Sequence, residues 1–134
     1  MYVSYNHLPS IKDSIGGIIM FELNSLRKLR QWKVRCRSLF LDETSGDVYF
    51  VTDSSAAVLK QTNGALSEIV KNKSKFENWY SVAYDWKRNI LLVGNAKNYA
   101  IEGEVLLFGL DKADPYLKSK LPVGINPSEI FLKY

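Results

Sequence analysis

The chain has 134 residues, of which 46% are hydrophobic and 13% aromatic, and it carries a formal net charge of +4 at pH 7. This length suits one compact domain, and the single cysteine, Cys36, excludes an internal disulfide bond. No apolar stretch approaches the roughly 20 residues that a membrane-spanning helix needs, and residues 1–10 lack the basic start and apolar middle of a signal peptide. We therefore expect a soluble protein without membrane insertion. Its compartment stays open, and an extracellular location is compatible with a fragment of a longer, receptor-like chain.

Short runs rich in Val, Ile, Leu, Phe and Tyr alternate with turn sequences such as Ser45-Gly46-Asp47 and Asn63-Gly64, a pattern typical of strands joined by tight turns. In chain order, the predicted strands cover residues 1–6, 17–23, 29–34, 38–42, 48–53, 57–61, 66–70, 81–85, 90–95, 103–110, 116–121 and 128–132. The sequence therefore predicts an all-β fold.

The predicted strands repeat. Residues 38–42 (Ser-Leu-Phe-Leu-Asp) and 81–85 (Ser-Val-Ala-Tyr-Asp) lie 43 residues apart, which is the length of one four-stranded propeller blade. Residues 128–132 begin a further copy of this segment, and residues 1–6 match the strand that comes directly after it in the other copies. If the strands of a blade are named A to D from the inside outwards, the chain reads BCD-ABCD-ABCD-A. Residues 1–134 then form a single propeller segment of three four-stranded blades, composed of residues 1–36 with 125–134, residues 37–78 and residues 79–122.

The second blade also carries a family-like motif. Residues 50–55 (Phe-Val-Thr-Asp-Ser-Ser), preceded by Asp42 and Gly46 and followed by Asn63-Gly64, resemble the YWTD repeat of the class B propellers of low-density-lipoprotein receptors. Residues 81–89 are similar to the segment that leads into that motif, although Gly94-Asn95 replaces Thr-Asp in the third blade. NHL-repeat and gluconolactonase-like propellers have similar blades. The resemblance implies a six-bladed ring, of which this chain supplies half.

Three blades cannot close a ring, because propellers ordinarily have about four to eight. Open blade faces and strand edges are usually covered by a partner. The first expectation is a homodimer in which two copies complete one six-bladed ring. The alternative is that another polypeptide chain supplies the remaining blades, and the sequence leaves both open.

Blade topology sorts the loops, because D–A and B–C connections share one rim of a propeller and A–B and C–D connections share the other. The first rim is rich in basic and aromatic residues, which suit a protein partner or an anionic ligand. The predicted partner-binding residues are Lys33, Arg35, Arg37, Lys73, Lys75, Trp79 and Tyr99. A second interpretation of the basic residues around 27–37 is a solvated outer strand that protects a blade edge.

The resemblance also implies one alternative function. Gluconolactonase-like and paraoxonase-like propellers hold a central metal, and Asn95, Asn126 and Glu129 are the corresponding candidates for a calcium site here. Asparagine and glutamate near turns more often cap and solvate those turns, so we expect no catalytic residues and no cofactor. The predicted function is a non-catalytic interaction or scaffolding module that completes its ring by association. The alternative is a calcium-dependent hydrolase.

Overall fold

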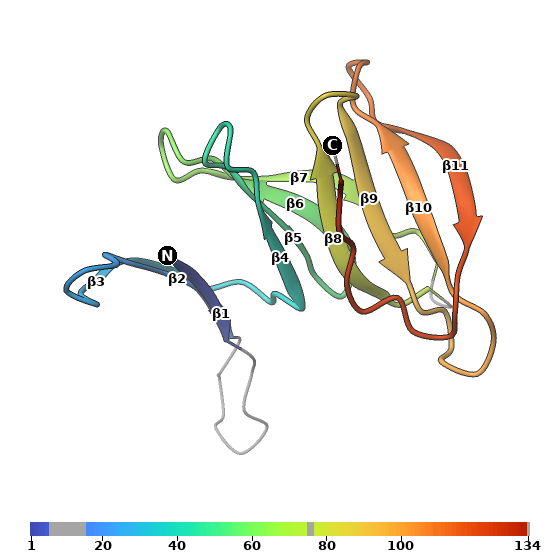
Figure 1. Ribbon diagram of the computed structural model, residues 1–134, viewed down its shortest axis with the longest axis horizontal. Helices are drawn as coiled ribbons and strands as arrows, with labels where there is room; N and C mark the ends of the chain where they lie inside the picture. The colour runs from blue at the N-terminus through green and yellow to red at the C-terminus, as the bar shows by residue number, and fades with distance from the viewer. Residues whose placement is uncertain (6–15, 75–76, 134) are drawn as a thin grey trace.

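The computed structural model describes residues 1–5, 16–74 and 77–133, and within these ranges the regular structure consists of β-strands alone. The strands form three antiparallel sheets that follow one another along the chain (Figure 1). The first sheet contains β1 (Tyr2–Tyr5), β2 (Gly17–Phe21) and β3 (Lys28–Trp32). The second contains β4 (Ser38–Leu41), β5 (Val48–Val51), β6 (Ser55–Leu59) and β7 (Leu66–Lys71). The third contains β8 (Trp79–Asp85), β9 (Ile90–Asn95), β10 (Glu104–Gly109) and β11 (Tyr116–Pro122).

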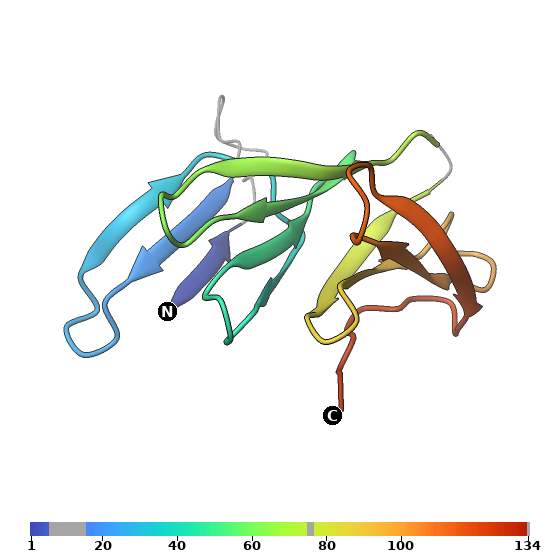
Figure 2. The same ribbon diagram turned by 90° about the horizontal axis from the view of Figure 1, so that it is seen from above.

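Each sheet is a meander in which neighbours in sequence are neighbours in space. Seen from above, the three sheets stand side by side as sectors of an arc (Figure 2). Strands β4 and β8 lie next to each other on the inner side of this arc, and β7 and β11 lie on its outer side. The predicted all-β fold of three blades, with strands in the order BCD, ABCD and ABCD, is therefore confirmed.

The middle sheet is buried on both faces, and its side chains alternate between two cores as the pleat of a strand requires. Tyr49 and Val51 on β5 pack with Val93 of the third sheet. Phe50, between them, packs with Ile18 of the first sheet. The two cores are therefore the two contacts between blades, and the three sheets pack face to face.

Strand register repeats with the same spacing as the sequence. Ser38 lies opposite Val51 in the second sheet, and Ser81 lies opposite Gly94 in the third. Ser81 follows Ser38, and Gly94 follows Val51, by the predicted 43 residues. The second and third blades are therefore structural copies of each other.

Cys36 lies in the core between the first and second sheets, where it is 4% exposed. Its thiol donates a hydrogen bond to the carbonyl oxygen of Ser38, with a distance of 3.5 Å between the sulfur and the oxygen. Burial raises the pKa of the Cys36 thiol to about 11. The thiol therefore stays protonated at neutral pH and packs as a small apolar side chain.

The last predicted strand has not formed. Residues 128–132 are described but belong to no sheet, so the ring is open and the final A position of the predicted order has no pairing. A strand needs a neighbour for its backbone hydrogen bonds, and β1, the strand that this segment should join, lies in the first sheet, at the other end of the arc. Among the described residues, no helix is long and apolar enough to cross a bilayer.

Candidate interaction site

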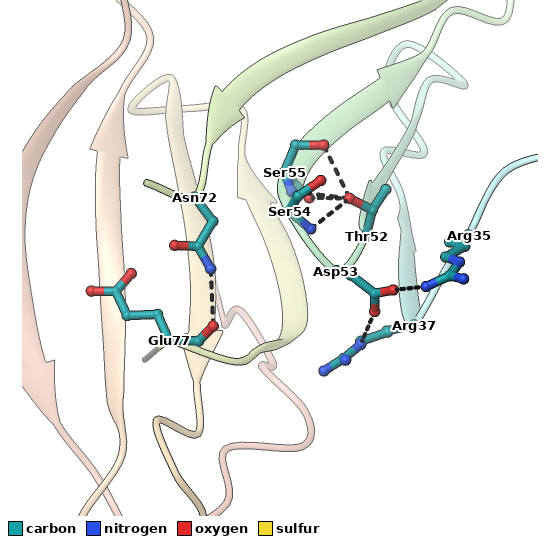
Figure 3. Close-up of polar contacts among 8 residues, drawn as sticks. All are labelled: Arg35, Arg37, Thr52, Asp53, Ser54, Ser55, Asn72 and Glu77. Carbon is teal, nitrogen blue, oxygen red and sulfur yellow. Dashed lines mark hydrogen bonds and ion pairs between the residues drawn. The ribbon is translucent and has the colours of Figure 1, made fainter. Parts of the chain in front are cut away.

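We call the surface formed by the β3–β4, β5–β6 and β7–β8 connections the loop face. The β5–β6 connection on this face is a turn that is capped by a side-chain hydroxyl (Figure 3). The hydroxyl oxygen of Thr52 accepts hydrogen bonds from the backbone N–H groups of Ser54 (3.1 Å) and Ser55 (3.0 Å). Threonine favours such turns because its side chain replaces a backbone acceptor. The turn places Asp53 at its tip, towards the β3–β4 connection.

Asp53 joins two of the predicted partner-binding residues. One carboxylate oxygen accepts a hydrogen bond from Arg35 at 2.6 Å, and the other accepts one from the Nε of Arg37 at 2.8 Å. These bonds, above all the one from Arg35, lower the pKa of the Asp53 carboxyl. Two guanidinium groups around one carboxylate leave this arginine–aspartate cluster with one net positive charge, and the Arg35 side chain is 63% exposed.

The β7–β8 connection is tied to the same turn. The backbone N–H of Asn72 donates to the carbonyl oxygen of Ser54 at 2.7 Å. The side-chain amide of Asn72 donates to the carbonyl oxygen of Glu77 at 3.0 Å, as Figure 3 shows. Lys73, which follows Asn72, is exposed. The three connections therefore form one continuous surface.

The structure divides the other predicted residues between two grooves. Arg37 lines an inner groove of about 620 Å³, together with Tyr80 and the segment after β11. Lys73 and Trp79 line an outer groove of about 500 Å³ between the second and third sheets. Lys33 is exposed on the β3–β4 connection. Lys75 lies outside the described residues.

Trp79 is a core residue and not the exposed aromatic that the sequence suggested. It is 2% exposed, its ring packs 5.8 Å from the ring of Phe108, and its indole N–H donates to the carboxylate of Glu77 at 3.2 Å. Its edge can only form part of the floor of the outer groove. An indole held in this way has no open face on which a ligand could stack.

Tyr80, absent from the predicted set, is the exposed aromatic of this strand. The pairing of β8 with β9 passes from Trp79 to Ser81 and skips Tyr80, so Tyr80 is the extra residue of a β-bulge. Its ring meets that of Tyr99 edge to face at 6.2 Å. The structure therefore brings Tyr80 together with the predicted residue Tyr99. The sequence signal was the presence of two aromatic residues in a row before the repeated segment that begins at Ser81.

The segment after β11, residues 123–133, is anchored on the third sheet. The hydroxyl of Ser81 donates to the carbonyl oxygen of Pro127 at 2.6 Å, and Val123 and Gly103 are joined by a backbone hydrogen bond of 3.1 Å. Beyond Pro127 the segment runs along the inner groove, which is lined by Arg37, Ser38, Leu39, Phe40, Tyr80, Ser81, Val82, Ser128, Glu129, Ile130, Phe131 and Leu132.

The alternative calcium ligands do not form a suitable donor set. Asn95 is 0% exposed, and its side-chain oxygen accepts hydrogen bonds from the backbone N–H groups of Asn78 (3.1 Å) and Lys97 (3.0 Å). This oxygen holds the β9–β10 and β7–β8 connections together and is not directed at a cation. Asn126 and Glu129 are exposed on the anchored segment. No group of three or more His, Cys, Asp or Glu residues that could hold a metal occurs within the described ranges.

No protein-family model matches the chain, and no curated protein matches its sequence. The resemblance to YWTD and NHL propellers therefore depends on the short motifs themselves.

Proposed function

We propose that this protein is a non-catalytic interaction module of the β-propeller type, which completes its ring by associating with further blades and presents its loop face to a protein or anionic partner. The observation that carries the proposal is that both end sheets leave apolar side chains exposed or half-exposed at positions whose counterparts in the middle sheet pack in its two cores. The motif resemblance to YWTD and NHL propellers is a second, weaker support.

The open face of the first sheet is apolar. Val3 and Ile19 lie opposite each other on β1 and β2, as Phe50 and Ala57 do on β5 and β6. Phe50 and Ala57 are buried against the first sheet, whereas Val3 is exposed and no sheet of the described residues lies against its face. Another blade on this side would give Val3 the environment that Phe50 has.

The open face of the third sheet also carries apolar side chains. Leu121 lies opposite Val105 on the outer pair of strands, as Val70 lies opposite Ala56 in the second sheet. Val70 packs against the core between the second and third sheets, but Leu121 is 49% exposed. Leu92 and Leu107 form a second apolar pair on the same face. Apolar surface of this kind is covered by a partner in most proteins.

The association can be tested by measuring the mass of the purified chain in solution by light scattering. We expect an assembly heavier than one chain of 15.3 kDa. Leu121→Lys should shift it to the mass of one chain, because a lysine on this face would have to be buried unpaired. Leu23→Lys, at an exposed position of the β2–β3 turn, is the matched control and should leave the assembly intact. A wild-type chain that stays monomeric at every accessible concentration would overturn the proposal.

The loop-face part of the proposal depends on charge. The arginine–aspartate cluster keeps one net positive charge, and the β3–β4 connection also carries the exposed residue Lys33. The tyrosine pair, with Tyr80 on β8 and Tyr99 in the β9–β10 connection, adds aromatic surface. Such a surface favours an acidic partner group through charge and ring contact. The β5–β6 turn, which carries Asp53, is the element at which this charge can be changed.

A further inference from the structure

We infer that the missing blades come from a second copy of this chain, and that residues 129–132 of each copy pair with β1 of the other as its missing innermost strand. This inference depends on the proposed association and adds the identity of the partner and the register of the pairing. It is carried by an unpaired strand edge, by the exposure pattern of a strand-like segment, and by the equivalence of the blades.

The edge of β1 is the place where a strand is missing. Tyr2 lies opposite Met20, as Tyr49 lies opposite Val58, so β1 occupies in the first sheet the position of β5 in the second. In the second sheet β4 covers the inner edge of β5, and in the third β8 covers that of β9. The sheet pairings of the described residues place no strand on the inner edge of β1. Unpaired edges of this kind accept strands from other chains.

The segment after β11 shows the alternating exposure of a strand that is covered on one face only. Ile130 and Leu132 are half-buried in the inner groove, whereas Phe131 is 87% exposed. In the second sheet Leu39 packs towards the preceding sheet and Phe40 towards the following one. Ile130 therefore corresponds to Leu39, and Phe131 corresponds to Phe40.

The inferred register differs by one residue from the alignment made from the sequence, which matched Ser128 with Ser38. In the inferred register, Lys133 takes the position of Asp42 and Asp85. Both aspartates accept hydrogen bonds from backbone N–H groups in the turn that joins strands A and B of their sheets. A strand that pairs with another chain needs no such turn, and Lys133 could not accept those hydrogen bonds.

The register of the exchanged strand is set by the same equivalence. Leu39 lies opposite Phe50, and Val3 takes the position of Phe50, so Ile130 of one copy should lie opposite Val3 of the other. Phe131 would then lie between the first and second sheets of the second copy, as Phe40 lies between the second and third. The open face of the third sheet would meet that of the first sheet of the second copy. Six is the only multiple of three blades within the range of about four to eight, so two copies are needed. A two-fold axis lets the segment after β11 of each copy pair with β1 of the other.

Disulfide trapping tests this pairing. Residues directly opposite on antiparallel strands have Cα atoms about 4.5–5.5 Å apart, within the range of about 4.4–6.8 Å that a disulfide needs. A Val3→Cys chain is mixed with an Ile130→Cys chain, so that the designed bond can form only between chains. We expect a covalent dimer under mild oxidation that disappears on reduction. Each single variant oxidised alone is the control for the native Cys36, which is buried.

Glu129→Cys, mixed with Val3→Cys, is the matched register control. Residue 129 would face the opposite side of the strand from residue 130, so this pair should yield several-fold less covalent dimer. Equal or greater yield from Glu129→Cys would overturn the register. A chain that is dimeric by light scattering but forms no disulfide from either pair would overturn the strand exchange and leave the proposed association standing. A monomeric wild-type chain would overturn both.

Discussion

Asp85 is a buried charge on which the β8–β9 turn depends. One carboxylate oxygen accepts hydrogen bonds from the backbone N–H groups of Lys87 (3.1 Å) and Arg88 (3.2 Å), and the other accepts one from the Arg88 guanidinium at 2.8 Å. Burial by itself would raise the pKa of the Asp85 carboxyl, but the bonds from Arg88 and Lys87 together outweigh it and lower the pKa. The folded chain therefore holds this carboxylate ionised more firmly than the unfolded chain does.

Asp85→Asn should lower the free energy of unfolding at pH 7 by about 1–3 kcal/mol, because the buried carboxylate that accepts from Lys87 and Arg88 is replaced by an uncharged amide with one acceptor oxygen. A lowered folded-state pKa stabilises the fold above the unfolded pKa of about 3.9, and the stabilisation is lost as the pH falls through the folded pKa. The wild-type chain should therefore lose more stability on acidification than the variant does. Urea unfolding at pH 7 and at several values below pH 4 measures both effects.

Glu43→Gln is the control for this substitution, because Glu43 is exposed in the neighbouring β4–β5 turn. It removes a carboxylate from an exposed side chain, whereas the Asp85 residue is 5% exposed. Equal losses of stability from Glu43→Gln and Asp85→Asn would contradict the role given to Asp85.

The positions of the strands could be predicted from the sequence, because alternation and turn residues act locally. The segments predicted at 48–53 and 90–95 contain β5 and coincide with β9. The repeat of 43 residues also gave the order of strands within each blade. These features need no knowledge of distant contacts, since each strand is defined by its own side chains and flanking turns.

The details of the candidate site could not be predicted in the same way. The bulge at Tyr80 decides which of two adjacent aromatics points outwards, and a bulge is visible only in the pairing with β9. The same bulge turns Trp79 into the core. The sequence alone does not fix the register inferred for the segment at 128–132, because Ser128 and Glu129 are both polar, and the inference depends on the exposure of Phe131.

The β5–β6 turn sets the charge of the loop face, since it holds Asp53 between Arg35 and Arg37. Asp53→Asn should leave both guanidinium groups without their counter-charge and strengthen binding to an anionic surface. We expect later elution from a polyanionic resin, with a difference that shrinks as salt screens the charges. Arg35→Glu should elute earlier than the wild-type chain.

Glu43→Gln, which makes the same change in net charge on the opposite rim, is the matched control for Asp53→Asn. If the loop face binds the resin, only the Asp53 variant should gain retention beyond the small effect of net charge. Identical elution of the two variants would show that the loop face does not select the anion.

At the scale of the whole molecule, the open arc has two end faces and an unpaired strand segment. Nothing in the sequence of one blade says what lies beside it, because the apolar pattern of an end blade is the same as that of a middle blade. Which blade lies beside an end blade depends on contacts between chains, and a substitution of Phe131 tests these contacts most directly. Its side chain is 87% exposed in the single chain, so it should add almost nothing to the stability of a monomer.

Association stabilises the folded state by mass action, so the melting temperature of the wild-type chain should rise with protein concentration. Phe131→Ser should abolish this rise, because the exchanged strand would lose its apolar anchor. At the lowest concentrations, where chains are separate, the variant and the wild type should melt together. Leu23→Ser, at another exposed leucine, should keep the concentration dependence. A variant at Phe131 that melts lower than the wild type even when dilute would show that this side chain supports the single chain, and the strand would then belong to its own fold and not to a second copy.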